Sequence, residues 1–238
     1  MIDREGPAAG ASAGNAGAFA FTDILPLASP GILRKAPKWL LDPLGPLSIP
    51  PSYLPGIAPW LWRFWRASRP ARAAHSLQAQ AAMMRLAQAA MERLVAEAGA
   101  EPMVRADGAL ELYESEAEWK AALPGWEVRA QAGIGFEHLR GEAIAALQPG
   151  LSPGLAFATF VPAWKNVEDP YLFATALAAH AERLGARLRQ AEVQAIDPAE
   201  DGVRIRLADG AVLAAGHAVI ACGAWSRPLA ARLGDAVP

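Results

Sequence analysis

The most regular pattern of apolar and polar positions lies in residues 73–98. Its apolar residues recur about every seven positions and are Leu77, Met84 and Met91, with Leu94 and Val95 extending the same stripe. This spacing places apolar side chains on one face of an α-helix. Gly99 follows directly, and glycine is the residue with which helices most often end. We therefore predict a long amphipathic helix over residues 73–98.

A second helical pattern begins at Asp169 and Pro170, which have the order of an N-cap residue followed by proline in the first turn. Its apolar face is predicted to carry Phe173, Leu177, His180 and Leu184. Gly185 is the predicted end of this helix. Shorter helices are predicted over residues 60–66 and 116–123.

Short runs of apolar and β-branched residues predict strands. The segments are 109–113, 126–131, 155–161, 187–196, 203–207, 211–214 and 217–221. Asp209-Gly210 lies between two of them and is a strong signal for a tight hairpin turn. The segment 217–221 is apolar and is interpreted as a buried strand. Strands and helices in this order predict an α/β plus α+β fold class.

Two segments are rich in residues that interrupt helices and strands. Residues 6–31 contain many Gly, Ala, Ser and Pro residues and are predicted to form a loop. Residues 37–59 hold seven prolines, at positions 37, 43, 46, 50, 51, 55 and 59. Because proline lacks an N–H donor and clashes inside helices, we expect neither a long helix nor a central strand there.

The composition is that of a folded protein, with 53% hydrophobic and 19% charged residues. A length of 238 residues is enough for one large or two modest domains. The net charge of -2 gives no electrostatic reason to expect nucleic acid as a partner. The single cysteine, Cys222, excludes an internal disulfide and fits a reducing compartment. Frequent alanine, and arginine in preference to lysine, suggest a bacterial source.

Residue types that carry catalysis or bind metals are sparse and scattered. The four histidines are His75, His138, His180 and His217, and none has metal-ligand spacing, so no metal site is predicted. No triad or paired-carboxylate motif is present, and no catalytic residue is assigned. Lys165 and Asn166 have two interpretations, as residues that face a cleft or as part of a solvated loop before Asp169.

The first residues, Ile2-Asp3-Arg4, have the pattern that ends the second strand of a dinucleotide-binding fold. An acidic residue at that place accepts hydrogen bonds from the adenosine ribose, about 20 residues after a glycine-rich phosphate loop. The alternative is that Asp3 belongs to a frayed, solvated terminus. Asp3 is therefore a candidate ribose ligand.

A string of small residues follows, from Gly10 to Gly17, with the sequence Gly-Ala-Ser-Ala-Gly-Asn-Ala-Gly. Small residues let backbone amides approach a pyrophosphate group and a flavin ring. Ser12 offers a hydroxyl group, and Asn15 can both donate and accept hydrogen bonds. A flexible linker is the alternative. Coming directly after Ile-Asp-Arg, this string resembles the D-amino-acid oxidase/dehydrogenase family of FAD-dependent enzymes, and is most similar to the D-amino-acid dehydrogenases.

Two later segments carry the same resemblance. Val193, within residues 190–196, resembles the family valine whose main chain meets the adenine, although alone it would be an ordinary strand valine. Residues 219–226 resemble the strand-to-helix turn near the cofactor, where Gly223 allows close backbone approach and Ser226 would cap the next helix. Cys222 is interpreted as a small buried hydrophobic residue. The resemblance implies FAD contacts from Asp3, Arg4, Ser12, Asn15, Ala16, Gly17, Val193, Cys222, Gly223 and Ala224.

The family's architecture implies a Rossmann-like FAD-binding domain, here residues 1–44 and 163–238, with an inserted mixed-sheet substrate domain, residues 45–162. The family's G-x-G-x-x-G motif does not occur in this sequence, because Gly133-Ile134-Gly135 lacks the third glycine. We therefore expect both domains to be incomplete, with roughly 25 to 30 residues missing in front and a longer segment missing behind.

The resemblance also implies an activity, the oxidation of the CH–NH2 group of an amino acid by hydride transfer to flavin N5. Its catalytic and carboxylate-binding residues are expected outside this sequence, and the electron acceptor, quinone or oxygen, stays open. Three alternatives remain at this point. They are a glycine- or sarcosine-type amine oxidase of the same superfamily, a non-enzymatic truncated remnant, and a membrane-surface interaction protein.

The aromatic segment Trp60–Trp65 has two interpretations. One is packing against the long helix, because aromatic side chains bury large areas. The other is contact with a membrane surface, with Arg63 and Arg66 near lipid headgroups. No run reaches the ~18 apolar residues of a membrane span, and the first residues lack a signal-peptide pattern. We expect a cytoplasmic protein, with peripheral contact at the inner face of the cytoplasmic membrane under the second interpretation.

Overall fold

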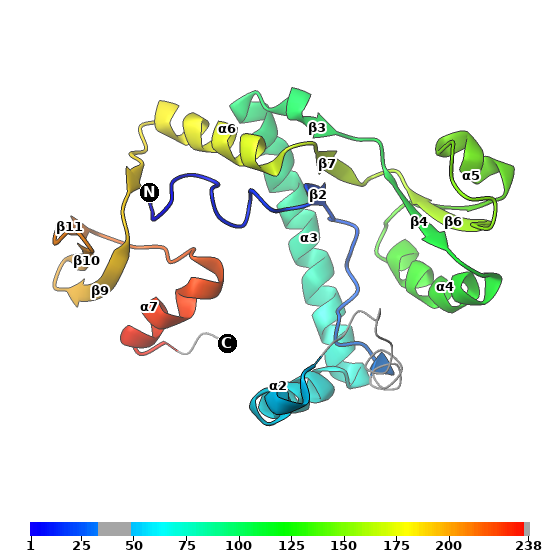
Figure 1. The fold of residues 1–238 in the computed structure, drawn as a ribbon, viewed down its shortest axis with the longest axis horizontal. Helices are drawn as coiled ribbons and strands as arrows, with labels where there is room; N and C mark the ends of the chain where they lie inside the picture. The colour runs from blue at the N-terminus through cyan, green and yellow to red at the C-terminus, as the bar shows by residue number, and fades with distance from the viewer. Residues whose placement is uncertain (33–48, 236–238) are drawn as a thin grey trace. The chain divides into compact units, whose positions relative to one another are not determined.

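A computed structural model describes residues 1–32 and 49–235, drawn in Figure 1. The chain divides into two compact units. Unit 1 comprises Met1–Gly17, Ala98–Met103 and Val167–Pro238, and unit 2 comprises Ala18–Glu97 and Val104–Asn166. The architecture is α/β with several small sheets. Among the described residues, no helix has the length and apolar character needed to cross a bilayer.

Unit 1 contains a two-stranded parallel sheet and a three-stranded antiparallel sheet. Strand β1 (Ile2–Asp3) pairs in parallel with β8 (Arg189–Gln190). The second sheet has the order β11-β10-β9, formed by β9 (Val193–Ala199), β10 (Gly202–Leu207) and β11 (Val212–Ala215). Two 3-10 helices, Glu101–Met103 and Gly223–Trp225, and the helices α6 (Pro170–Arg183) and α7 (Ser226–Arg232) complete the unit.

The local signals at α6 and at the hairpin are confirmed. The Asp169 side chain accepts a hydrogen bond from the Leu172 N–H at 2.9 Å and caps α6, as predicted. Asp209-Gly210 connects β10 to β11, and Gly210 has the positive φ of +83° that such a turn needs. Leu184, however, is 76% exposed and does not belong to the buried face of the helix.

Two strand predictions in unit 1 need correction. The expected strand 187–196 is two short strands, β8 and β9, separated by Ala191-Glu192. Residues 217–221 form no strand, and Val219 is 89% exposed. A buried strand requires neighbours that satisfy its N–H and C=O groups, and no strand among the described residues pairs with this segment.

Unit 2 contains the long helix and two three-stranded sheets. Helix α2 (Leu54–Ala67) follows a 3-10 helix at Pro51–Tyr53 and leads into α3 (Pro70–Ala98). One sheet has the order β2-β7-β3, with β2 (Ala18–Phe19), β3 (Val104–Arg105) and β7 (Lys165–Val167). The other has the order β4-β6-β5, with β4 (Ala109–Tyr113), β5 (Glu137–Arg140) and β6 (Phe157–Val161).

The predicted long helix is confirmed as α3, which begins at Pro70 and ends before Gly99, where φ is +67°. Its predicted stripe is half-buried or buried, and Ala73 and Ala81 are buried as well. Helix α2 is longer than the predicted 60–66 and contains Pro55 and Pro59. The expectation of no long helix in residues 37–59 is therefore wrong for residues 54–59, and its part at residues 37–48 lies outside the described residues. Pro55 lies in the first turn, where no N–H donor is needed.

The sheet β4-β6-β5 lies between two helices, α4 (Glu116–Gln131) and α5 (Glu142–Leu147) (Figure 1). Leu139, Ile144 and Ala158 form the core on the α5 side. The side chains of Trp119 and Trp126, seven residues apart on α4, are buried. The predicted helix 116–123 and strand 126–131 are therefore one helix, which continues through Pro124.

The misassigned strand has a physical explanation. Residues 126–131 alternate between apolar and polar side chains, a pattern that a short sequence shares between strand and helix. The Trp126 Nε1–H donates to the Tyr113 hydroxyl at 2.7 Å, and this buried contact with β4 favours the helix. The N-cap is Ser115, whose hydroxyl accepts from the Glu118 N–H at 3.2 Å.

Candidate functional site

All ten predicted cofactor-binding residues lie in unit 1. Asp3 ends β1, and its main-chain carbonyl accepts from the Ala191 N–H at 2.9 Å. Its carboxylate oxygen Oδ1 accepts from the N–H groups of Glu5 and Gly6, both at 2.9 Å. Within residues 1–32 and 49–235, its other oxygen Oδ2 has no hydrogen-bond donor. Asp3 is thus exposed but fixed, with one carboxylate oxygen available to a ligand hydroxyl.

Arg4 connects the end of β1 to a segment more than 200 residues away in sequence. The Arg4 guanidinium carbon lies 5.7 Å from the ring centroid of Trp225. Its Nη2 lies 3.1 Å from Glu5 Oε1, and its carbonyl accepts from Gln190 Nε2 at 3.4 Å. These contacts bring the predicted residues Asp3 and Arg4 to the 3-10 helix that contains Gly223 and Ala224. Sequence reasoning gave Trp225 no role.

The loop from Gly10 to Gly17 is a series of turns. The Ala13 N–H donates to the Gly10 carbonyl at 3.2 Å, and the Asn15 N–H donates to the Ser12 carbonyl at 3.3 Å. In the part of the chain that the structure describes, the N–H groups of Ala11, Ser12 and Gly14 have no acceptor. Successive free N–H groups form anion-binding sites in turns. These N–H groups are therefore available to an acceptor outside the loop.

Asn15 and Gly17 shape the end of this loop. The Asn15 Oδ1 accepts from the Gly17 N–H at 2.8 Å, which leaves the Asn15 amide NH2 as a donor. Gly17 is buried, has a φ of +75°, and its carbonyl accepts from the Val167 N–H at 2.8 Å. A Cβ atom at this position would lie 2.2 Å from the Val167 carbonyl oxygen. The fold itself therefore requires glycine at position 17.

The later predicted residues lie at the same end of the parallel sheet. Val193 begins β9 three residues after β8, is half-buried, and pairs with Leu207. Gly223 has a φ of +54°, with no atom within 4 Å of a Cβ added there. Cys222 is exposed, so its interpretation as a buried hydrophobic residue is wrong, because the expected strand before it does not form.

The predicted cap of the last helix also needs correction. Helix α7 begins at Ser226, and its N-cap residue is Trp225, without a side-chain capping hydrogen bond.

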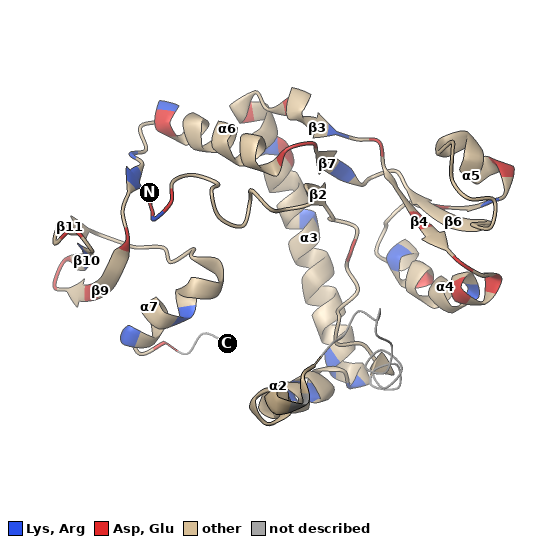
Figure 2. Ribbon diagram, in the orientation of Figure 1, with Lys and Arg blue, Asp and Glu red and all other residues tan. Residues whose placement is uncertain are grey.

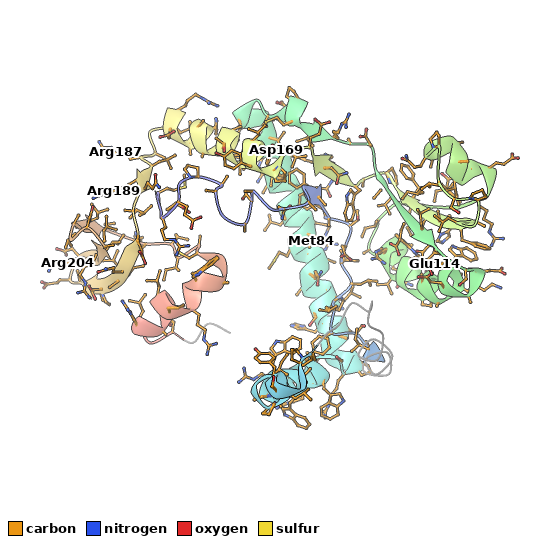
Figure 3. All side chains as sticks on the ribbon, viewed as in Figure 1. Met84, Glu114, Asp169, Arg187, Arg189 and Arg204 are labelled. Carbon is orange, nitrogen blue, oxygen red and sulfur yellow. The ribbon has the colours of Figure 1, made fainter. Side chains whose placement is uncertain are left out.

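The hairpin between β10 and β11 is held by an ion pair. Arg189 on β8, labelled in Figure 3, pairs with Asp209 of the hairpin at 2.8 Å. The hydrogen bonds from the Ala211 N–H and from Arg189 lower the pKa of the Asp209 carboxyl. These contacts fix the hairpin next to β8.

Unit 2 contains a cavity of about 220 Å³ that the sequence did not indicate. It is lined by Thr22, Asp23, Ala109, Leu110, Glu111, Trp126, Arg129, Val161 and Trp164. The Arg129 side chain is only 14% exposed, lies 4.5 Å from the Trp126 ring centroid, and pairs with Asp23 at 3.3 Å. The cavity thus combines a largely buried cation with aromatic walls. The sequence did not reveal Arg129 as a cavity residue, because residues 126–131 were predicted to form a strand.

Two ionisable groups beside the α4 helix have altered pKa values. Burial raises the pKa of Tyr113, so its hydroxyl stays protonated and donates to Glu111 Oε1 at 3.0 Å. Burial also lowers the pKa of His138, with a smaller contribution from the charge of Arg140. The His138 Nδ1 lies 2.8 Å from the Thr159 hydroxyl. Both groups are held near their neutral forms.

Lys165 and Asn166 were predicted to lie in a loop, but they belong to strand β7. Lys165 pairs with Glu92 at 2.8 Å, and this hydrogen bond lowers the pKa of the Glu92 carboxyl. Asn166 Oδ1 accepts from Trp164 Nε1 at 3.1 Å. No group of three or more metal-ligating side chains is found in the described ranges.

Comparison with known proteins identifies one family. The sequence pattern of the DAO family, described as FAD dependent oxidoreductase, matches residues 1–238. A D-amino-acid oxidase of Bradyrhizobium diazoefficiens is 32% identical over 232 residues, which are 96% of this chain and 54% of that protein. A D-amino acid dehydrogenase of Xylella fastidiosa is 32% identical over 245 residues, covering 100% of this chain and 56% of that protein. The chain spans about half the length of these relatives.

Solved structures show the same fold at lower identity. Glycine oxidase from Geobacillus kaustophilus superposes with a TM-score of 0.65 and 22% identity, over 99% of this chain and 51% of that chain. Iminodiacetate oxidase from Chelativorans sp. BNC1 superposes with a TM-score of 0.61 and 19% identity, over 100% of this chain and 52% of that chain. The chain therefore shares the fold of the corresponding half of these two oxidases.

Proposed function

This chain belongs to the DAO family of FAD dependent oxidoreductases, and from this membership we propose that it forms part of an enzyme that oxidises the CH–NH2 group of an amino acid. The observation that carries the proposal is the similarity, along nearly the whole chain, to proteins named D-amino-acid oxidase and D-amino acid dehydrogenase. In this chemistry, bound FAD accepts a hydride from the substrate carbon. The protein supplies binding, orientation and electrostatics.

The donors and acceptors in unit 1 fit FAD. Asp3 Oδ2 can accept a hydrogen bond from a ribose hydroxyl group, while Oδ1 keeps the carboxylate fixed. The free N–H groups of the loop from Gly10 to Gly17 suit a pyrophosphate. Val193 is proposed to offer its main chain to the adenine, and Gly223, with open space around it, to allow the dinucleotide to approach. The remaining contacts, from Arg4, Ser12, Asn15, Ala16, Gly17, Cys222 and Ala224, are proposed from the same family resemblance.

The domain organisation is proposed on the same basis. Residues 1–44 and 163–238 form a Rossmann-like FAD-binding domain, and residues 45–162 form an inserted substrate domain. The parallel pairing of β1 with β8 supports the first, since parallel strands characterise dinucleotide-binding folds. Unit 2 is compact and has its own sheets, which supports a separate second domain, but its boundaries differ from the proposed ones. Unit 2 comprises Ala18–Glu97 and Val104–Asn166, and Ala98–Met103 belongs to unit 1.

The substrate and the electron acceptor are separate parts of the proposal. An amino acid is the proposed substrate, with a quinone or oxygen as electron acceptor. A cytoplasmic location is proposed from the single cysteine, which fits a reducing compartment. Peripheral contact with the membrane through Trp60–Trp65 is also proposed.

The decisive experiment measures substrate-dependent electron transfer. The 238-residue chain, and in parallel any longer product of the same gene, is loaded with FAD, and its flavin content is measured by absorbance. Each holoprotein is then mixed with D-amino acids, L-amino acids, glycine or sarcosine, with either a dye acceptor or oxygen. Reduction of the dye without oxygen uptake indicates a dehydrogenase, and oxygen uptake indicates an oxidase. A preference for glycine or sarcosine favours the alternative amine oxidase. A longer product of the gene that holds FAD and oxidises none of these amines refutes the proposed function.

A further inference from the structure

Helix α2 has an apolar side that the protein buries only in part, since Ile57, Leu61, Phe64 and Trp65 are half-buried and the other members are exposed. Residues three and four positions apart form this side, and they are Tyr53, Leu54, Ile57, Trp60, Leu61, Phe64 and Trp65. Helix α2 contains no buried residue at all. Trp60 is 53% exposed, and Tyr53, which precedes the helix, is 59% exposed. The interpretation that this aromatic segment only packs against the long helix therefore does not account for its exposure.

The aromatic side chains of α2 are ordered among themselves. Trp60 stacks on Phe64 with ring centroids 5.0 Å apart, and Trp62 lies 4.7 Å from Trp65. The guanidinium carbon of Arg69, between α2 and α3, lies 4.7 Å from the Trp65 ring centroid. Because these side chains are already ordered, binding a partner would cost less side-chain conformational entropy.

The charge of this region differs in sign from the charge of the whole chain. Between Asp42 and Glu92 the sequence contains no acidic residue. The same segment contains the arginines Arg63, Arg66, Arg69, Arg72 and Arg85. The chain as a whole has a net charge of -2. Figure 2 shows the contrast, with blue and no red on α2.

We propose that α2 and the first turn of α3 bind the surface of a bilayer that contains anionic lipids. A helix with tryptophan, phenylalanine and leucine on one side and arginine on the other lies in the plane of a membrane interface. Tryptophan and tyrosine side chains prefer the headgroup region, and the arginines attract anionic headgroups. A nucleic acid would use the arginines but would leave the apolar side of α2 in water. This proposal is independent of the proposed oxidoreductase activity.

The test compares two kinds of vesicle and two pairs of charge variants. The chain is sedimented with vesicles of phosphatidylcholine alone, or with vesicles that also contain phosphatidylglycerol. The variant Arg63→Gln/Arg66→Gln removes two charges from α2. The control Arg187→Gln/Arg204→Gln removes the same charge from two exposed arginines of unit 1, labelled in Figure 3. Since each arginine near an anionic surface contributes about fivefold to partitioning, the α2 pair should lower binding about 25-fold and the control pair far less.

A second pair of variants separates apolar contact from charge. Trp60→Ala/Trp62→Ala removes an exposed ring of the apolar side and the exposed ring that borders this side through its contact with Trp65. The pair should lower binding to both kinds of vesicle at least about tenfold, because these rings contact the interface. The control Met83→Ala/Leu86→Ala removes two apolar side chains of α3 that are 70% and 68% exposed, and should leave binding unchanged. Because all four side chains are more than half exposed, none of these changes should unfold the chain, which circular dichroism checks.

Four results would overturn the proposal. The first is that the chain does not bind the anionic vesicles, and the second is that the α2 variants bind them as well as the original chain does. The third is that the control variants lose as much vesicle binding as the α2 variants. The fourth is that the chain binds a single-stranded oligonucleotide but not vesicles. Analytical ultracentrifugation adds a fifth. Self-association that the tryptophan changes abolish, without vesicle binding by the original chain, would assign the surface to a second copy of the chain.

Discussion

Replacing Gly17 with alanine should destabilise the protein for two separable reasons. The φ of +75° places a non-glycine residue in the left-handed region, which costs about 1–2 kcal/mol. The added Cβ would also lie 2.2 Å from the Val167 carbonyl oxygen, so the backbone must shift. That shift weakens the 2.8 Å hydrogen bond from the Val167 N–H to the Gly17 carbonyl, worth about 1 kcal/mol. The expected loss in free energy of unfolding is about 3 kcal/mol.

Two glycines of the same segment serve as matched controls. Gly6 has a φ of +97° and open space around it, so Gly6→Ala should lose only about 1 kcal/mol. Gly14 has open space and no positive φ, so Gly14→Ala should change stability by less than about 0.5 kcal/mol, or stabilise slightly. Urea unfolding followed by circular dichroism ranks the three variants. Hydrogen exchange of the Val167 amide should become faster only in Gly17→Ala. If Gly17→Ala is no more destabilising than Gly6→Ala, the steric part of this reasoning is refuted.

Three further predictions concern Asp3, Tyr113 and His138. Asp3→Asn should keep the turn through its Oδ1 but weaken FAD retention about tenfold, as measured by flavin absorbance after gel filtration. Asp3→Ala should lose both the turn and FAD retention. Unchanged retention in both variants would show that Asp3 is not part of the site. Tyr113→Phe should cost about 1–3 kcal/mol in urea unfolding, because the buried Trp126 Nε1–H loses its acceptor, while Tyr171→Phe at a 41% exposed position should cost almost nothing. Burial lowers the pKa of His138 from 6.5, so the folded state binds this proton less readily than the unfolded state. Stability should therefore fall as the pH drops below 6.5, and His138→Gln should flatten this dependence; an unchanged slope would contradict the assignment.

Much of the local structure was predictable from short sequence patterns. The cap at Asp169, the hairpin turn at Asp209-Gly210 and the strand Ala109–Tyr113 all appear as predicted. Each depends on residues that are close in sequence, so the information is contained in the segment itself. The cofactor candidates near the first strand were found in the same way, because Asp3 and the small residues after it are contiguous.

The errors arose where distant residues decide between two local options. Residues 126–131 are helical because Trp126 reaches Tyr113 of another element. Residues 217–221 have the composition of a strand but no strand partner in the described part of the chain, and so Cys222 is exposed. No short pattern contains either fact.

The sequence alone thus determined the helices α3 and α6, the turn at Asp209-Gly210, the family resemblance and the location of the candidate FAD residues along the chain. Only the tertiary structure showed that Arg4 meets Trp225, that Arg129 lines a cavity, and that Gly17 is required by the Val167 carbonyl. The physical reason is that caps, turns and apolar stripes depend on neighbours within a few residues. Burial, close backbone approach and ring contacts depend on segments that meet only when the chain has folded.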